Sequence, residues 1–248
     1  MEHITSRKNP YIQRLRALGR ERSFRREAGE FLCDGRKLLA EAVQCGAEIT
    51  GVLWCDTPDT ELPAEVRQYS APKELLQYAS AMENSPGPLF TVRIRETEPA
   101  RTPERILVLE NLQDPGNVGT VLRTAAAFRS DLVVLCGSCA DPYNPKCVRA
   151  SMGAIFRQRF AEWKLEELCT RLRDWGVPLY GAALHREAVD IRALPLQKAA
   201  VAVGNEGNGL TEELLARCEK RLIIPMDPNS ESLNAAVAAS VILWEMSR

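Results

Sequence analysis

The 248-residue sequence has no run of about 18 apolar residues, so it offers no candidate for a membrane-spanning helix. Its first residues, MEHITS, lead directly into charged residues and lack the apolar core of a secretory signal peptide. The net charge of only −1 does not by itself indicate a class of partner. With 45% hydrophobic and 26% charged residues, the composition predicts a globular cytoplasmic protein, either one large domain or two small ones.

The eight cysteines lack the pattern of a zinc site. Cys136 and Cys139 form one C-x-x-C pair and Cys147 lies near it, but no second pair follows at a suitable spacing. A reducing compartment favours free, buried cysteines. We therefore expect thiols that pack in the core and no bound metal.

The sequence also lacks both common phosphate-binding fingerprints. It contains no G-x-x-x-x-G-K-[ST] and no G-x-G-x-x-G. The stretch GNEGNG at residues 204–209 has glycines at a different spacing, and Glu206 would repel a pyrophosphate. These absences disfavour a nucleoside triphosphate or a dinucleotide and favour a smaller ligand held by backbone groups and apolar side chains.

Charge is concentrated at the N-terminus. Residues 1–26 contain eight basic and two acidic residues, a local charge of +6, and arginine outnumbers lysine seven to one. A solvated helix face would explain this pattern, and so would a surface for nucleic acid, because guanidinium groups pair bidentately with phosphate. On the second interpretation the candidate RNA-binding residues are Arg7, Lys8, Arg14, Arg22, Arg25 and Arg26.

The chain divides into two parts. Residues 1–95 predict a small α/β domain, with helices at 5–20, 37–46 and 73–82 and strands at 30–35, 49–55 and 89–94. Residues 96–104 lie in a charged, proline-containing stretch without apolar periodicity and are the candidate linker.

Residues 105–248 have a different pattern. Strand-like apolar runs alternate with helical segments, at 106–112, 131–137, 177–184, 198–205 and 221–226. Such runs predict a parallel sheet with helices on both faces, in which ligands bind at the carboxyl ends of the strands.

Three polar loops follow strands of this sheet, at residues 111–123, 204–210 and 225–236. Each has a purely structural interpretation: Asn117 could cap a helix, the glycines could provide positive φ angles, and Ser230 or Ser232 could cap the last helix. Their shared position at one edge of the sheet favours a ligand site over three independent structural roles.

The three loops, in this order, resemble the motifs of the SpoU/TrmH family of RNA ribose methyltransferases, in the SPOUT superfamily. The matching stretches are NLQDPGNVGTVLRTAAAF (111–128), VGNEGNGL (203–210) and IIPMDPNSESLNAAVAASVILWE (223–245). RASMGA (149–154) is similar to a small-residue segment found between the first two. TSRKNPYIQRLRAL (5–18) and FLCDGRKLLAEA (31–42) resemble a substrate-binding domain that often precedes the catalytic one, although Asp34 stands where the family more often has glutamate.

The resemblance implies S-adenosylmethionine as methyl donor and the 2′-hydroxyl of an RNA ribose as acceptor. Both ribosomal RNA and tRNA are possible substrates, and the appended N-terminal domain favours ribosomal RNA. It also implies a C-terminal trefoil knot and a homodimer. By the same resemblance the catalytic residues are Asn117, Arg123, Glu206, Ser232 and Asn234, and the cofactor-binding residues are Gly204, Ile224, Met226, Leu233 and Asn234.

The role of Arg123 is restricted by its chemistry. A guanidinium is effectively always charged, so Arg123 is better suited to gripping a phosphate and stabilising a developing alkoxide than to removing a proton. We expect Glu206 to hold the arginine or the asparagine of this network, and His185 to be a surface residue. The alternatives are a catalytically silent RNA-binding or assembly protein of the same fold, and a methyltransferase that modifies a base.

Overall fold

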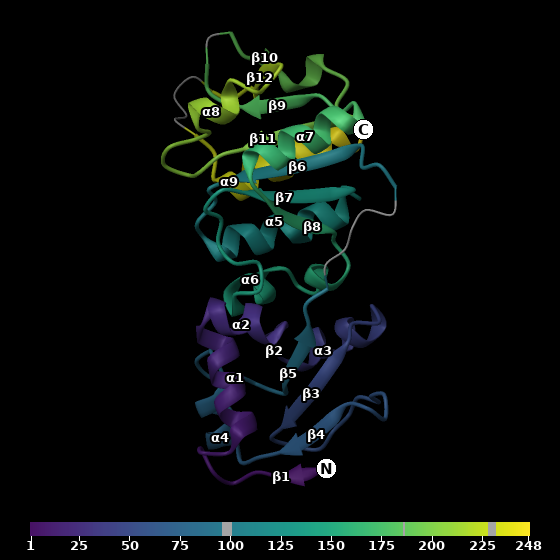
Figure 1. Ribbon diagram of the computed structural model, residues 1–248, viewed down its shortest axis with the longest axis vertical. Helices are drawn as coiled ribbons and strands as arrows, with labels where there is room; N and C mark the ends of the chain where they lie inside the picture. The colour runs from purple at the N-terminus through teal and green to yellow at the C-terminus, as the bar shows by residue number, and fades with distance from the viewer. Residues whose placement is uncertain (96–100, 186, 228–231) are drawn as a thin grey trace. The chain divides into compact units, whose positions relative to one another are not determined.

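The computed structural model describes residues 1–95, 101–185, 187–227 and 232–248 (Figure 1). The chain folds into two compact units, each with most of its residue contacts inside the unit. The first unit comprises Met1–Arg95 and Asp141–Arg157, and the second comprises Glu96–Ala140 and Gln158–Arg248. Residues 96–100 of the candidate linker lie outside the described residues. The membership of residues 141–157 in the first unit is a feature that the sequence pattern does not indicate.

The first unit contains a mixed sheet in the order β1-β4-β3-β5-β2. β5 pairs antiparallel with β2 and β3, whereas β4 pairs parallel with β1 and β3. The strands are β1 (Glu2–His3), β2 (Glu30–Asp34), β3 (Ile49–Trp54), β4 (Arg67–Ser70) and β5 (Leu89–Arg93). The helices are α1 (Pro10–Arg20), α2 (Arg22–Ala28), α3 (Arg36–Gln44), α4 (Lys73–Ala79), α6 (Pro145–Ala150) and the 3₁₀ helix η1 (Ala154–Phe156).

Helix α1 begins five residues later than its predicted start. The Asn9 side chain accepts a hydrogen bond from the Tyr11 amide at 2.8 Å, and Pro10 occupies the first helical position. Proline is favoured there because its amide needs no partner, and it disfavours helical geometry in the residue before it. Ser6 instead accepts from the Lys8 amide in the preceding turn. The predicted start at residue 5 was therefore wrong.

The second unit contains, within the described residues, a seven-stranded sheet in the order β10-β12-β9-β11-β6-β7-β8. All of its strand pairs are parallel, as predicted. The strands are β6 (Arg105–Glu110), β7 (Leu132–Cys136), β8 (Phe160–Trp163), β9 (Leu179–Ala182), β10 (Val189–Asp190), β11 (Ala199–Val203) and β12 (Lys220–Ile223). The helices are α5 (Pro115–Ala127), α7 (Leu165–Trp175), α8 (Glu212–Leu215), α9 (Ala235–Met246) and the 3₁₀ helix η2 (Ile191–Ala193).

Helices cover both faces of the central strands (Figure 1). Ile106 and Val108 of β6 pack with residues of α7 and α8 in one core cluster, whereas the alternate residues Leu107 and Leu109 are buried outside that cluster. Helix α9 packs against β11, β6 and α5. The continuous apolar runs of the sequence thus reflect strands buried on two sides.

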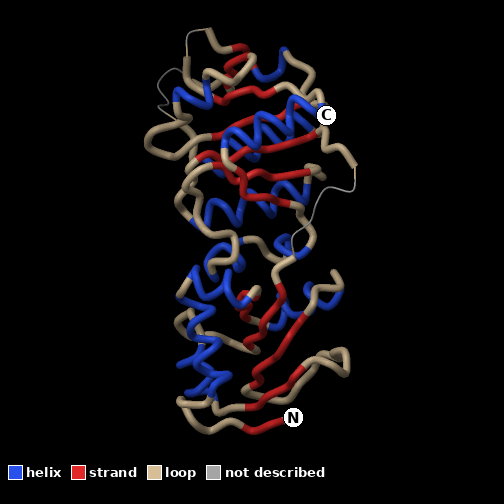
Figure 2. The backbone as a smooth tube through the Cα atoms, viewed as in Figure 1, coloured by secondary structure: helices blue, strands red, loops and turns tan. Residues whose placement is uncertain are grey.

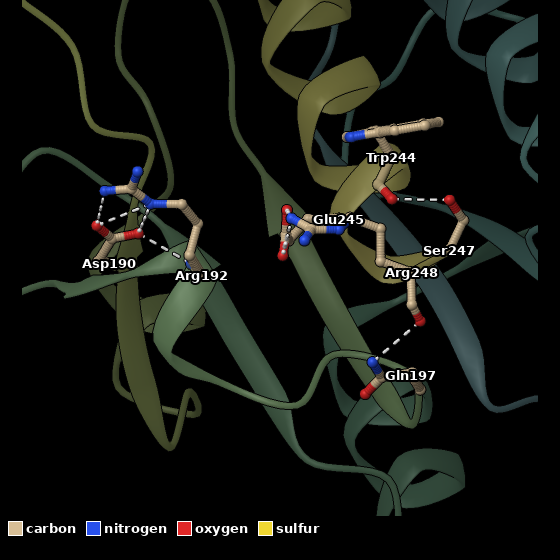
Figure 3. Close-up of polar contacts among 7 residues, drawn as sticks. All are labelled: Asp190, Arg192, Gln197, Trp244, Glu245, Ser247 and Arg248. Atoms are coloured by element: carbon tan, nitrogen blue, oxygen red, sulfur yellow. Dashed lines mark hydrogen bonds and ion pairs between the residues drawn. The ribbon is translucent and has the colours of Figure 1, made fainter.

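The C-terminal helix is fixed at its two ends. Asn234 caps its first turn by accepting from the amides of Ala236 and Val237. At its other end the Gln197 side chain donates to the Arg248 carbonyl at 3.1 Å (Figure 3). Of the two serines considered as caps, Ser230 lies outside the described residues and Ser232 is displaced from this role by Asn234. None of the helices formed by the described residues is both long and apolar enough to span a bilayer.

Candidate active site

The three polar loops leave strands at the same edge of the second unit's sheet. β6 leads into the first loop, β11 into the second and β12 into the third. β11 pairs with β6 on one side and with β9 on the other, and β9 pairs with β12. Figure 2 shows the strands of this sheet side by side. Because all pairs are parallel, the loops meet at the carboxyl edge, where ligands bind in α/β sheets.

The first loop is organised by Asp114 rather than by Asn117. The Asp114 side chain accepts from the Asn117 amide at 3.0 Å and caps α5, with Pro115 in the first turn. The capping role considered for Asn117 is therefore filled by its neighbour. This arrangement leaves the Asn117 side chain available for other contacts.

Asn117 joins the three loops. Its Nδ2 donates to Glu206 Oε1 at 2.6 Å, and its Oδ1 accepts from Asn234 Nδ2 at 3.4 Å. These residues lie 89 and 117 positions apart from it in the sequence, so their meeting is a product of the fold. The structure also shows that Glu206 holds the asparagine of the network.

The second loop is a tight turn braced against the first. Asn205 and Gly209 exchange two backbone hydrogen bonds, and the Asn205 side chain accepts from the amides of Gly207 and Asn208. Its Nδ2 donates to the Asn111 carbonyl at 3.0 Å. Asn111 has a φ of 54°, a left-handed conformation that asparagine tolerates better than most residues. This turn therefore presents Glu206 next to Asn117.

A cavity of about 470 Å³ lies beside this network, within the usual range for small-ligand sites. Apolar side chains form much of its wall, including Val203, Ile224 and Leu233, and the Gly204 backbone contributes to it. Gly204 has no room for a side chain, because an added Cβ would lie 2.1 Å from the Gly209 carbonyl carbon. The second and third loops thus form a compact, mostly apolar pocket.

The cofactor residues expected from the sequence divide into two groups. Four of them line the cavity: Gly204, Ile224, Met226 and Leu233. Asn234 is not among the described residues that line it. Asn234 is occupied with capping α9 and contacting Asn117, which places it on the side of the first loop. Its expected role beside the cofactor stays a prediction.

Other cavity residues were missed by the sequence reasoning. His185 is exposed, as expected, but it also lines the cavity together with Leu184. Both follow β9, so their position at the end of an apolar run is a signal that could have found them. Glu212 and Arg221 line another part, with 3.7 Å between Arg221 Nη2 and Glu212 Oε2. No motif in the sequence distinguishes that pair.

The two remaining catalytic candidates occupy different positions. Ser232 lines the cavity. Arg123 is exposed on α5, six residues after Asn117, which corresponds to about 9 Å along a helix axis. It makes no hydrogen bond or ion pair with any residue that the structure describes. The fold thus joins Asn117, Glu206 and Asn234 and leaves the Arg123 guanidinium available to a ligand.

The cysteine pair lies in the same unit, and both thiols are free and buried, as expected. Burial raises the pKa of both the Cys136 and the Cys139 thiol to about 11. The Cys139 thiol donates to the Leu109 carbonyl at 3.2 Å. Both thiols are therefore protonated at neutral pH and pack in the core.

The chain matches known proteins over its whole length. Residues 104–244 match the SpoU rRNA Methylase family, more than half of the sequence. The chain belongs to the SpoU rRNA methylase family. This confirms the resemblance seen in the three motifs. Within this SpoU protein, residues 9–88 match the MRM3-like substrate binding domain, which coincides with most of the first unit.

Individual SpoU relatives cover both units. The chain is 30% identical to the 23S rRNA (guanosine(2553)-2′-O)-methyltransferase RlmP of Bacillus subtilis over 99% of each chain. It is 31% identical to the 23S rRNA (uridine(2479)-2′-O)-methyltransferase of Streptomyces viridochromogenes, over 99% of this chain and 93% of the relative. The AdoMet-bound rRNA methyltransferase of Sinorhizobium meliloti superposes with a TM-score of 0.88 at 26% identity, covering 99% of this chain and 97% of that one.

The predicted RNA-binding arginines of this SpoU chain do not share one environment. Arg7 and Lys8 are exposed. Arg14 donates to Glu30 at 2.8 Å, and Arg26 lies 3.9 Å from Asp141. Arg22, on α2, is exposed.

Arg25 contradicts the prediction. Arg25 is only 2% exposed to solvent. Its Nε and Nη2 atoms donate to Asp141 Oδ2, at 2.8 and 2.6 Å. Its Nη1 donates to the Leu18 carbonyl at 2.7 Å. A guanidinium committed in this way cannot bind an RNA phosphate, so Arg25 is a structural residue of the first unit.

Replacing Arg25 by methionine is expected to lower the free energy of unfolding by about 3 kcal/mol, because the buried Asp141 carboxylate would lose both hydrogen bonds from Arg25 and keep only the more distant Arg26, at 3.9 Å. Urea denaturation followed by circular dichroism measures the change. The exposed Arg20→Met is the matched control and should shift stability little. Recovery of much of the loss in the Arg25→Met/Asp141→Leu double variant would identify the unpaired carboxylate as the cause, and a loss no larger than that of the control would refute the structural role.

Proposed function

We propose that this protein transfers a methyl group from S-adenosylmethionine to the 2′-hydroxyl of a ribose in ribosomal RNA. The observation that carries the proposal is the hydrogen-bonded set Asn117, Glu206 and Asn234 beside the apolar cavity of the second and third loops. Relatives that align with the chain along both units are named as 23S rRNA 2′-O-methyltransferases. Ribosomal RNA is therefore favoured over tRNA as the substrate.

The cavity fits S-adenosylmethionine. Its apolar walls suit an adenine ring, and the Glu206 carboxylate in its wall would repel a pyrophosphate. Gly204, Ile224, Met226 and Leu233 would hold the cofactor, as the sequence predicts, with Leu184 and His185 at the pocket wall. When bound, S-adenosylmethionine would supply the methyl group: the bond from O2′ to the methyl carbon would form as the carbon–sulfur bond breaks, and the hydroxyl proton would leave to water.

The chain's own residues position the acceptor. Asn117 orients the ribose, and Glu206 and Asn234 fix the Asn117 amide in one orientation by holding its nitrogen and its oxygen. Arg123 grips the phosphate next to the target nucleotide and stabilises the negative charge that develops on O2′. Ser232 completes the site at the cavity wall. Positioning of donor and acceptor supplies much of the rate enhancement in such a displacement.

The experiment that tests this function is transfer of tritiated methyl groups to RNA from a strain that lacks the gene. We expect label in ribosomal RNA and none in RNA from the parent strain, where the site is already modified. Incorporation into tRNA alone would contradict the substrate class. Absence of label from both RNA classes would favour a catalytically silent RNA-binding protein of the same fold.

We also propose that the C-terminal segment forms a trefoil knot and that the protein acts in the cytoplasm, where ribosomal RNA is its substrate. The family resemblance supports the knot. The proximity of the second and third loops around one cavity agrees with it, because the knot would hold both loops against the same ligand.

A homodimer is proposed through the exposed face of α9. Val237, Val241 and Trp244 are spaced as a helical stripe and are 49%, 36% and 55% exposed. Trp244 packs edge-on against Phe128 of the neighbouring α5, with 5.5 Å between ring centroids. In Figure 3 its indole projects to the side opposite Gln197. An exposed apolar stripe of this kind favours association with a second copy.

The Val241→Glu/Trp244→Glu variant is expected to be monomeric, because two carboxylates cannot be buried at a self-complementary apolar interface. Size-exclusion chromatography with light scattering measures the mass. Val43→Glu, at an exposed valine of the first unit, is the control and should leave the dimer intact. A monomeric unaltered protein, or a dimer that survives the double substitution, would contradict this interface.

A further inference from the structure

Two classes of cations in the first unit differ in their surroundings. Many are neutralised by carboxylates within the unit and contribute little to the field outside it. The neutralised arginines are Arg14 with Glu30, Arg25 with Asp141, Arg36 with Asp56 and Asp59, Arg93 with Glu48, and Arg157 with Glu41. The second class lies on α1 and the turn before it.

The Tyr78 ring of α4 contacts two arginines of this second class, Arg7 and Arg16. The Arg16 guanidinium carbon lies 3.8 Å from the Tyr78 ring centroid, and the Arg7 guanidinium carbon lies 4.5 Å from it. Arg16 Nη1 also donates to the Tyr78 carbonyl at 2.6 Å, and Gln13 Nε2 donates to the Arg7 carbonyl. Two guanidinium groups are thus held near one aromatic ring by contacts that involve no carboxylate.

The surrounding charge is positive. Arg20 lies one helical turn after Arg16, and Lys8 follows Arg7. Among the described residues, none of these four cations is ion-paired with a carboxylate. Glu74, one turn before Tyr78 on α4, is the acidic residue of this helix, and it forms no ion pair with Arg7 or Arg16 within the described chain. Two like charges held close together without a counterion create a site for an anion.

We propose that this α1–α4 surface, formed by Arg7, Lys8, Arg16, Arg20 and Tyr78, is the RNA-binding surface of the first unit. The proposal rests on the RNA substrate of the proposed function. Arg7 and Arg16 bind phosphates, and the Arg–Tyr stack offers a planar surface to an unpaired base. The surface differs from the one predicted by charge counting, because it includes Arg16 and Arg20 and leaves out Arg14, Arg22, Arg25 and Arg26.

The chemistry favours RNA over a lipid surface. Interleaved arginine and tyrosine side chains bind both phosphate and base, whereas a membrane-binding helix also needs exposed apolar side chains. The exposed large apolar residues in the described part of the chain include none on α1 or α4. Arg16 is also half-buried, so its orientation is fixed before RNA arrives, which lowers the entropy cost of binding.

The test is the affinity of the full chain for a fluorescein-labelled RNA hairpin of about 30 nucleotides, measured by anisotropy between about 50 and about 200 mM salt. The Arg7→Gln/Arg16→Gln variant should bind roughly tenfold more weakly and lose about 2 units from the slope of log affinity against log salt. Arg36→Gln/Arg93→Gln removes the same charge from the same unit and should leave the slope unchanged. An equal change in both variants, or no change in the first, would overturn the proposal.

Tyr78 provides a second test that separates positioning from charge. Tyr78→Phe keeps the ring and should bind the hairpin as the unaltered chain does, whereas Tyr78→Leu should weaken binding several-fold with the net charge unchanged. Equal binding by the two variants would show that the ring does not organise the arginines. Anionic vesicles that bind the unaltered chain while the hairpin does not would also overturn the proposal.

These measurements are separable from the proposed function. S-adenosylmethionine binding by calorimetry should be the same in all of these variants, since the cavity lies in the second unit. Loss of hairpin binding in the Arg7/Arg16 variant would support the surface even if no methyl transfer were found, and methyl transfer that persists with unaltered hairpin binding would refute the surface alone.

Discussion

Arg123→Lys is expected to lower the single-turnover rate of methyl transfer by a factor of about 10² to 10³ while leaving the affinity for S-adenosylmethionine unchanged. Arg123 is exposed on α5 and makes no hydrogen bond within the described chain, so its guanidinium is available to the RNA. Lysine keeps the charge but cannot donate two parallel hydrogen bonds to a phosphate. The substitution therefore tests bidentate geometry rather than charge.

The matched control is Arg129→Lys, the same change at an exposed arginine just beyond the end of α5. It should retain nearly the full rate. Calorimetric titration with S-adenosylmethionine reports the cofactor site separately, because Arg123 does not line the cavity. A rate for Arg123→Lys close to that of the control would show that Arg123 acts only through its charge or not at all.

Gly204→Ala is expected to weaken S-adenosylmethionine binding by about 100-fold or more. The added Cβ would lie 2.1 Å from the Gly209 carbonyl carbon and 2.3 Å from the Leu210 nitrogen, both of them backbone atoms. These atoms cannot move independently, since Asn205 and Gly209 are joined by two backbone hydrogen bonds. The turn would have to open, and the cavity wall would open with it.

Gly207→Ala is a control in the same loop. A Cβ added at Gly207 would have Asn205 Oδ1 as its nearest atom, at 3.5 Å, which is an ordinary contact distance. Cofactor affinity should therefore change by less than about threefold. Circular dichroism checks that both variants fold. Equal cofactor affinity in the two variants would show that the tight Gly204 turn does not form the pocket.

Much of the second unit was predictable because its signals are local. Apolar runs such as 106–112 and 198–205 identify buried parallel strands, and the loops that follow them identify the site edge. The structure confirms the parallel sheet, and the family match confirms the resemblance. The meeting of Asn117 with Glu206 follows from the pairing of β6 with β11.

The first unit shows where local signals fail. Arg25 belongs to an arginine-rich stretch typical of an RNA surface, yet its partner Asp141 lies 116 residues later. Asp141 belongs to the segment 141–157. In the sequence this segment lies between two stretches of the second unit, but in the structure it belongs to the first unit. Short strands such as β1 and β4 were missed because two to four residues carry too little periodicity.

The lining of the cavity was predictable only in part. Ile224 and Leu233 come from matched motifs, whereas Glu212 and Arg221 reach the cavity from α8 and β12 without any motif. Asn234 was assigned a catalytic and a cofactor-binding role, and both stay predictions. Its side chain caps α9 and contacts Asn117, which no local pattern in the sequence indicates. The assignment of roles therefore needed side-chain geometry.

The most direct test of the central claim is the chemical position of the transferred methyl group. RNA labelled with tritiated S-adenosylmethionine is hydrolysed in alkali, where each phosphodiester is cleaved by attack of its own 2′-hydroxyl. Ribose methylation blocks that attack, so we predict label in alkali-resistant dinucleotides and its loss in the Arg123→Lys variant. Label recovered in mononucleotides would place the methyl group on a base and would contradict the proposed ribose 2′-O-methylation.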